Sequence, residues 1–134
     1  MKSFKEIGLE LTDKVSYHRY DRFYPRFLES LRDKKFNMLE IGYGDGGSLK
    51  LWKEYFQKAH ITVMDIGIEG KDDRSKIIKL DQSNKDHLQI MVDEMPKCKF
   101  IIDDGSHHPY HQFITFTKLF NELLEEGGIY IIED

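Results

Sequence analysis

The sequence predicts an α/β fold of the Rossmann-like, doubly wound type with a mostly parallel sheet. Two observations carry this prediction. After residue 35, short apolar runs rich in branched and aromatic residues alternate at least four times with amphipathic helical patterns. A glycine-rich turn, GYGDGG at 42–47, directly follows the first of these runs. In open parallel sheets, the loop after the first strand is a place where ligands bind.

Five apolar runs are the predicted strands. Their composition suits strands that are buried on both faces of a parallel sheet. They are FNMLEI at 36–41, ITVMDI at 61–66, KIIKL at 76–80, KFIIDD at 99–104 and GIYIIED at 128–134. The sequence stops at the last of them without a following crossover, which suggests a fold truncated after its fifth strand.

Four amphipathic patterns predict helices, and we expect their apolar stripes to be core. The stripes are Phe23, Tyr24, Phe27, Leu28 and Leu31; Leu51, Trp52, Tyr55 and Phe56; Leu88, Met91, Val92 and Met95; and Phe113, Phe116, Phe120, Leu123 and Leu124. Pro25 is compatible only with a first helical turn, and Ser48 is the expected N-cap of the second helix. Gly127 or Gly128 is expected to stop the last helix.

The remaining organisation is simple. We expect one domain overall, with an N-terminal helical arm at 1–34 and a Rossmann-like cofactor-binding domain at 35–134. The polar segment GIEGKDDRS at 67–75 is expected to be a surface loop.

Composition excludes several classes of partner. The formal net charge is −4, and the charged residues form no basic stripe, so nucleic acid is not expected. Cys98 is the single cysteine, which rules out an intramolecular disulfide and fits a reducing, cytoplasmic setting. The N-terminus lacks the apolar segment of a signal peptide, and no apolar run is long enough to span a membrane. No membrane partner is expected.

The glycine-rich turn predicts a nucleotide-bearing ligand. Glycines allow a sharp turn and close backbone approach, and the following helix offers unpaired amides. Asp65 ends the second strand, 18 residues after Gly47 (65 minus 47), where a carboxylate can accept hydrogen bonds from both hydroxyls of a ribose. These features fit a nicotinamide dinucleotide and S-adenosylmethionine equally well.

Two further carboxylates favour S-adenosylmethionine. Glu40 lies within the first strand, where it would repel the diphosphate of a dinucleotide and attract a cationic amino-acid group. Asp81 follows the third strand and can accept a hydrogen bond from an adenine amino group, with Gln82 beside it.

The fourth and fifth strands end in DDGSHH and IIED. If these strands are neighbours, Asp104, Glu133 and Asp134 converge at one edge of the sheet. Carboxylates without cysteine suit a hard ion such as Mg²⁺, although a solvated acidic rim is the plain alternative. His107 is the expected general base that removes the proton of a hydroxyl acceptor, and His108 and His111 are the alternatives.

Together these segments resemble the class I S-adenosylmethionine-dependent methyltransferases. Within that class the chain is similar to the metal-dependent macrolide sugar O-methyltransferases of the mycinamicin and macrocin type, and to cephalosporin-hydroxylase-like proteins. The matching segments are LTDKVSYHRYDRFYPRFLE, MLEIGYGDGGSLKLWKEYF, VMDIG, LDQSN, IIDDGSHHPYHQFITF and GGIYIIED. They run in order along nearly the whole chain.

The resemblance implies a set of site residues and an activity. The cofactor-binding residues implied are Glu40, Gly42, Gly44, Ser48, Asp65, Asp81, Gln82 and, with them, Asp103. Asp104, Glu133 and Asp134 match Mg²⁺ ligands, and His107 matches the base. The implied reaction is methyl transfer to a hydroxyl of a sugar or similar small metabolite.

Two alternatives stay open. An NAD-binding oxidoreductase could use the same fold, although Glu40 disfavours it. A non-catalytic cofactor-binding remnant is favoured by the two strands that this chain lacks relative to the seven of the family. An incomplete sheet would also favour a homo-oligomer.

Overall fold

A computed structural model describes residues 1–133, and the predicted metal ligand Asp134 lies outside them. The chain divides into two compact units. One comprises Met1–Lys35 with Gly44–Ala59, and the other comprises Phe36–Tyr43 with the chain from His60 onward. The predicted division into an arm at 1–34 and a domain at 35–134 stays a prediction.

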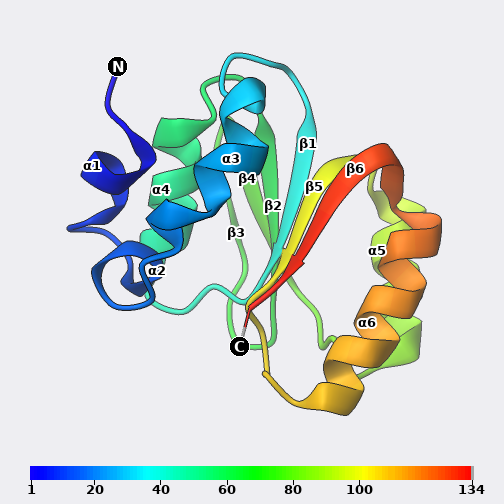
Figure 1. The fold of residues 1–134 in the computed structure, drawn as a ribbon. Helices are drawn as coiled ribbons and strands as arrows, with labels where there is room; N and C mark the ends of the chain where they lie inside the picture. The colour runs from blue at the N-terminus through cyan, green and yellow to red at the C-terminus, as the bar shows by residue number, and fades with distance from the viewer. Residues whose placement is uncertain (134) are drawn as a thin grey trace. The chain divides into compact units, whose positions relative to one another are not determined.

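The second unit is built on a six-stranded sheet with the order β3-β4-β2-β1-β5-β6 (Figure 1). All neighbouring strands are parallel except the edge pair of β3 and β4. The strands are β1 (Asn37–Ile41), β2 (His60–Asp65), β3 (Gly70–Lys71), β4 (Ser75–Lys79), β5 (Cys98–Asp103) and β6 (Leu124–Ile132). The predicted α/β class with a mostly parallel sheet is confirmed.

The strand order creates a switch point between β1 and β5. From β1 the chain proceeds outward through β2 to β4, then returns to the other side of β1 and continues through β5 to β6. Ligands of doubly wound folds bind at the carboxyl ends of the strands beside such a reversal. Strand β1 ends at Ile41, directly before the GYGDGG turn, as the sequence predicted.

Helices α5 (Lys85–Glu94) and α6 (Pro109–Glu122) cover one face of this sheet side by side, as Figure 1 shows. Between them and the strands lies a core of branched, sulfur-containing and aliphatic side chains. Its buried members are Leu39, Ile41, Met64, Leu88, Met91, Cys98, Ile101, Ile114, Leu119, Leu123 and Leu124. The predicted stripe at 88–95 therefore faces the core, with Val92 and Met95 partly buried at its margin.

The predicted aromatic stripe of α6 is wrong in part. Phe113, Phe116 and Phe120 are 65%, 36% and 47% exposed, whereas Ile114, Thr115 and Leu119 are buried. The helix thus has two rows of largely apolar residues at helical spacing, one of phenylalanines and one of branched side chains. The row with the branched side chains faces the sheet. Helix α6 also ends at Glu122, before Gly127 and Gly128, because Leu124 already pairs with Cys98 at the start of β6.

Two further local predictions are corrected. The N-cap of α4 (Gly47–Tyr55) is Gly46, not Ser48, because the Asp45 carboxylate accepts a hydrogen bond from the Gly47 amide and starts the helix earlier. The segment 67–75 is not only a loop, because it contains the short strand β3. The turn from β3 to β4 is held by the Asp72 carboxylate, which accepts hydrogen bonds from the Arg74 and Ser75 amides.

The first unit is helical and has an aromatic core. Besides α4 it contains α1 (Phe4–Gly8), α2 (Asp13–Ser16), α3 (Tyr24–Leu28) and the 3-10 turns η1 (Tyr20–Arg22) and η2 (Glu29–Leu31). The ring of Phe4 contacts those of Tyr24, Trp52 and Tyr55, with centroids 5.1 to 5.9 Å apart. Such contacts add about 0.5–1.5 kcal/mol each beyond area burial. Pro25 lies in the first turn of α3, as predicted.

The stripe predicted for 23–31 is only half core. Tyr24, Leu28 and Leu31 are buried, but Phe23 and Phe27 are exposed. The stripe of α4 is entirely buried, as predicted. Within residues 1–133, no helix has the length and apolar character needed to cross a membrane.

The Tyr55 hydroxyl donates a hydrogen bond to Glu29, and this bond is the main reason why the pKa of Glu29 lies below its ordinary value. A lowered pKa contributes stability above the unfolded-state pKa and loses it as the pH falls through the folded-state value. We expect Tyr55→Phe to lower the free energy of unfolding by about 1 kcal/mol at pH 7, and by less at pH 3. Urea unfolding measures this difference. Tyr17→Phe, at an exposed ring, is the matched control, and equal losses at both pH values would contradict the assignment.

Candidate active site at the carboxyl ends of the strands

The central strands of the second unit end in register. Ile41 of β1 lies opposite Asp103 of β5, which lies opposite Ile132 of β6. The backbone continues this alignment by one residue, because the Asp104 amide donates to the Ile41 carbonyl and the Glu133 amide donates to the Asp103 carbonyl, both at 2.9 Å. Asp104 and Glu133 therefore lie side by side at one edge of the sheet, as the sequence predicted.

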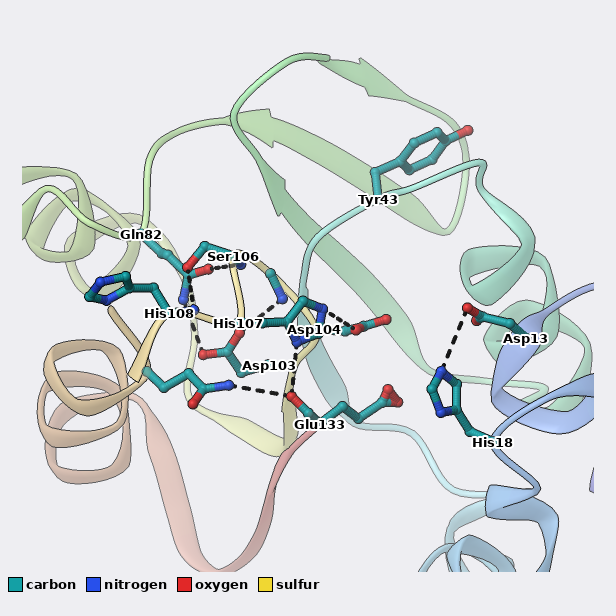
Figure 2. A network of polar contacts seen from close by, with 12 residues as sticks. Asp13, His18, Tyr43, Gln82, Asp103, Asp104, Ser106, His107, His108 and Glu133 are labelled. Carbon is teal, nitrogen blue, oxygen red and sulfur yellow. Dashed lines mark hydrogen bonds and ion pairs between the residues drawn. The ribbon is translucent and has the colours of Figure 1, made fainter. Parts of the chain in front are cut away.

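His107 lies between these two residues (Figure 2). Its Nε2 is 3.3 Å from the Asp104 carboxylate, and its Nδ1 is 3.2 Å from the Glu133 carbonyl oxygen. A carbonyl oxygen can only accept, so Nδ1 is the donor in that contact, and Nε2 is the ring nitrogen that faces the Asp104 carboxylate. The backbone of His107 has φ of 61°, a left-handed conformation that is costly for a residue with a side chain.

The two rival histidines have other contacts. His108 is the N-cap of α6, and its Nδ1 accepts a hydrogen bond from the Tyr110 amide. His111 Nδ1 lies 2.8 Å from the Ser106 hydroxyl. His87 accepts a hydrogen bond from the Asp81 amide at 2.9 Å. His107 Nε2 lies next to the Asp104 carboxylate, which supports its selection as the candidate base.

The Asp104 backbone also fixes the turn after β1. Gly42 has φ of 97°, and a Cβ atom there would lie 2.2 Å from the Asp104 carbonyl oxygen. The Gly42 amide donates to the Met64 carbonyl at 2.8 Å. This glycine therefore has a packing reason for its presence, independent of any ligand.

We expect Gly42→Ala to lower the free energy of unfolding by about 2 kcal/mol or more, because the side chain combines a left-handed conformation with a backbone clash. Chemical unfolding measures this loss. Gly44→Ala is the matched control, since Gly44 also has a positive φ but no described atom within 4 Å of its Cβ position. Equal losses in the two variants would contradict the importance of the Asp104 contact.

Two predicted cofactor-binding carboxylates lie at the carboxyl ends of β2 and β4. The Asp65 Oδ1 accepts from the Tyr43 amide at 3.0 Å, and its Oδ2 accepts from the Gly67 amide at 2.8 Å. Each oxygen keeps a second lone pair. Asp81 accepts from the Ser83 hydroxyl and amide, and these bonds hold the pKa of Asp81 below its ordinary value. Asp65 and Asp81 are therefore present as oriented carboxylates.

The remaining predicted cofactor residues fall in both units. Glu40 is buried within β1, paired with Val63 and Ile102 on either side. Gly44 and Ser48 belong to the first unit, where Gly44 has φ of 57° and Ser48 is buried in the first turn of α4.

Gln82 and Asp103 form a network that the sequence did not reveal. Asp103 is 1% exposed, and burial raises the pKa of its carboxyl, opposed by hydrogen bonds from the Gly105 amide and Gln82. The Gln82 amide also contacts Thr115 and Ser106. The available signal was Thr115, a polar residue on the otherwise apolar buried face of α6.

The donor chemistry of this edge suits a hard cation. Asp104 supplies a partly exposed carboxylate, and Glu133 supplies a second one from the neighbouring strand. Within residues 1–133, no group of three His, Cys, Asp or Glu side chains is arranged to hold a metal ion. The third predicted ligand, Asp134, lies outside the described residues.

Comparison with known proteins extends these observations. No protein-family model matches the chain. The chain is 33% identical over 132 residues to 8-demethyl-8-alpha-L-rhamnosyl tetracenomycin-C 2'-O-methyltransferase of Streptomyces olivaceus, an alignment that covers 92% of this chain and 35% of that protein. It also matches the solved structure of MycE methyltransferase from the mycinamycin biosynthetic pathway, in complex with Mg, S-adenosylhomocysteine and mycinamycin VI. That match has a TM-score of 0.92 and 30% identity and covers 99% of this chain and 39% of MycE.

The chain is a homologue of the macrolide sugar O-methyltransferases. It spans little more than a third of the length of the relatives that it matches. This methyltransferase homologue has the class I methyltransferase fold, as its sequence predicted. The fold alone does not identify the cofactor, because a short-chain dehydrogenase family protein from Francisella tularensis also matches it, with a TM-score of 0.58 at 14% identity.

Proposed function

We propose that the protein to which this chain belongs is an S-adenosylmethionine-dependent, Mg²⁺-dependent O-methyltransferase that acts on a hydroxyl of a sugar. The observation that carries the proposal is the placement of Asp104, His107 and Glu133 at the edge of the sheet beside the β1/β5 switch point. The matched MycE structure contains Mg and S-adenosylhomocysteine, which supports the same pair of ligands here.

In this proposal the residues have separate tasks. Asp65 accepts hydrogen bonds from the ribose hydroxyls, Asp81 accepts from the adenine amino group, and Glu40 attracts the cationic amino-acid end of the cofactor. Gly42, Gly44 and Ser48, in the glycine-rich turn and the helix start, are the further cofactor-binding residues of the proposal. Asp104, Glu133 and Asp134 hold the metal ion.

His107 Nε2 accepts the proton of the sugar hydroxyl, because Nδ1 is committed to the Glu133 carbonyl. S-adenosylmethionine supplies an activated methyl group, and Mg²⁺ lowers the pKa of the hydroxyl. The contribution of the protein is therefore to hold the acceptor oxygen in line with the methyl–sulfur bond and within reach of the base.

Calorimetric titration tests the proposal. The 134-residue chain is titrated with S-adenosylmethionine and separately with NADH, each with and without Mg²⁺. We expect S-adenosylmethionine to bind and NADH not to bind. Binding of NADH alone would favour the oxidoreductase, and binding of neither by a folded chain would contradict a cofactor site within these residues.

We also expect the second unit to self-associate. Phe113, Phe116 and Phe120 form an exposed apolar row on α6, and β6 is an edge strand of the sheet. Replacing Phe113 and Phe120 by Ser should shift the chain toward the monomer in sedimentation velocity experiments. Phe27→Ser, at an equally exposed phenylalanine of the first unit, is the control. A monomeric wild-type chain at about 100 μM would contradict the expectation.

A further inference from the structure

Both the nitrogen and the oxygen of the Gln82 side-chain amide form hydrogen bonds within the protein. It lies in the turn between β4 and α5 and is 5% exposed. Its Nε2 donates to Asp103 Oδ2 at 3.0 Å and to Thr115 Oγ1 at 3.1 Å, and its Oε1 accepts from the Ser106 amide at 2.8 Å (Figure 2). Both N–H groups of the amide are therefore used, and one residue connects three segments.

The orientation of this amide follows from its partners. The Ser106 amide can only donate, so the oxygen of Gln82 must face it. The Thr115 hydroxyl donates to the His111 carbonyl at 2.6 Å, which leaves its oxygen to accept from Gln82. The donors and acceptors of this network therefore pair in only one orientation of the Gln82 amide. The network holds the side chain in that conformation.

The loop after β5 lies directly against this amide. A Cβ atom at Gly105 would be 1.9 Å from the Gln82 oxygen, so only glycine permits this contact. The Gly105 amide donates to Asp103 Oδ1 at 3.0 Å. Residues 105 and 106 are therefore held against both Asp103 and Gln82.

This loop carries the side chains of Asp104 and His107, two residues of the candidate site. The hydrogen bond from Ser106 to Gln82 immediately precedes His107, whose left-handed backbone turns the imidazole back toward Asp104. A costly conformation of this kind persists only where the surrounding structure holds it. The hydrogen bond to Gln82 fixes the peptide that precedes His107, and the contact with the Glu133 carbonyl fixes the His107 ring.

We propose that the side chain of Gln82 positions His107 and Asp104 and is not itself a cofactor contact. The inference rests on the proposed function, because it assigns Gln82 to the part of the proposed site that holds the metal ion and the base. It differs from the expectation of a cofactor-binding Gln82.

The test uses Gln82→Met, which keeps the length of the side chain and removes its polar atoms. Gln89→Met is the matched control, because Gln89 lies on α5 and contacts Asp93 and Lys118, away from the loop. The first readout needs no ligand: nuclear Overhauser contacts between the His107 ring and the Asp104 Hβ protons. We expect them in the wild type and in Gln89→Met, and we expect their loss in Gln82→Met.

The second readout uses two probes, S-adenosylmethionine by calorimetry and Mn²⁺ by paramagnetic broadening of the His107 ring signals. We expect Gln82→Met to bind S-adenosylmethionine within about threefold of the wild type and to require about tenfold more Mn²⁺ for equal broadening. A tenfold or greater loss of S-adenosylmethionine affinity with unchanged His107 contacts would overturn the inference.

Two outcomes separate the inference from the proposed function. If the wild type binds neither probe, the proposed function fails, and the ligand-free His107 contacts still decide whether Gln82 positions the ring. If Gln82→Met does not fold, Gln82→Asn replaces it, because the shorter amide keeps its polar atoms but cannot reach the Ser106 amide. His107 contacts that survive in Gln82→Asn would overturn the inference.

Discussion

Asp104→Asn should strongly slow metal-dependent methyl transfer and leave the cofactor affinity within about threefold of the wild type. The substitution keeps the shape of the side chain and allows its amide to hydrogen-bond to His107 Nε2, but it removes the negative charge that a cation requires. A bound metal ion contributes several kcal/mol to such reactions, so we expect a loss on the order of 10³-fold in rate. The measurements are Mn²⁺ binding by electron paramagnetic resonance and transfer of a radiolabelled methyl group to a panel of glycosides.

The control for this variant is Asp73→Asn, which removes a carboxylate from the exposed segment between β3 and β4. It should change neither readout. Simultaneous loss of Mn²⁺ and S-adenosylmethionine binding in Asp104→Asn would count against a separate metal site at the end of β5.

Asp65→Ala should weaken S-adenosylmethionine binding by about 3 kcal/mol, which is roughly a 100-fold increase in Kd. The carboxylate is oriented by the Tyr43 and Gly67 amides and can accept two further hydrogen bonds from ribose hydroxyls. Calorimetry measures the loss, and Mn²⁺ broadening of the His107 signals should be unaffected.

Asp65→Asn separates the two roles of this residue. It keeps one oxygen for the Tyr43 amide and loses the charge and one acceptor, so its affinity should fall between those of the wild type and Asp65→Ala. Wild-type affinity in both variants would show that the ribose is not bound at the end of β2.

The sequence predicted the architecture well because its apolar runs are short, regularly spaced and interrupted by amphipathic stretches. Placement of the carboxylates followed from the fold class, since parallel strands bring Asp104 and Glu133 to one edge whatever the side-chain details.

Other features depended on information that periodicity does not contain. Helix α6 carries two apolar rows, and the spacing alone could not show that Ile114 and Leu119 face the sheet while Phe113 does not. The position of Gln82 next to Asp81 suggested a shared ligand, but the direction of its side chain depends on partners 21 to 33 residues away. Contacts of this kind are set by tertiary packing.

The buried thiol of Cys98 has a practical consequence for the experiments above. Burial raises the pKa of this thiol to about 12, so it is almost entirely protonated near neutral pH and reacts slowly with alkylating reagents. Because the sequence contains no other cysteine, a cysteine introduced on the surface would be the one reactive site. A spin label or fluorophore could then be attached at a chosen position on α6 without first removing a native residue.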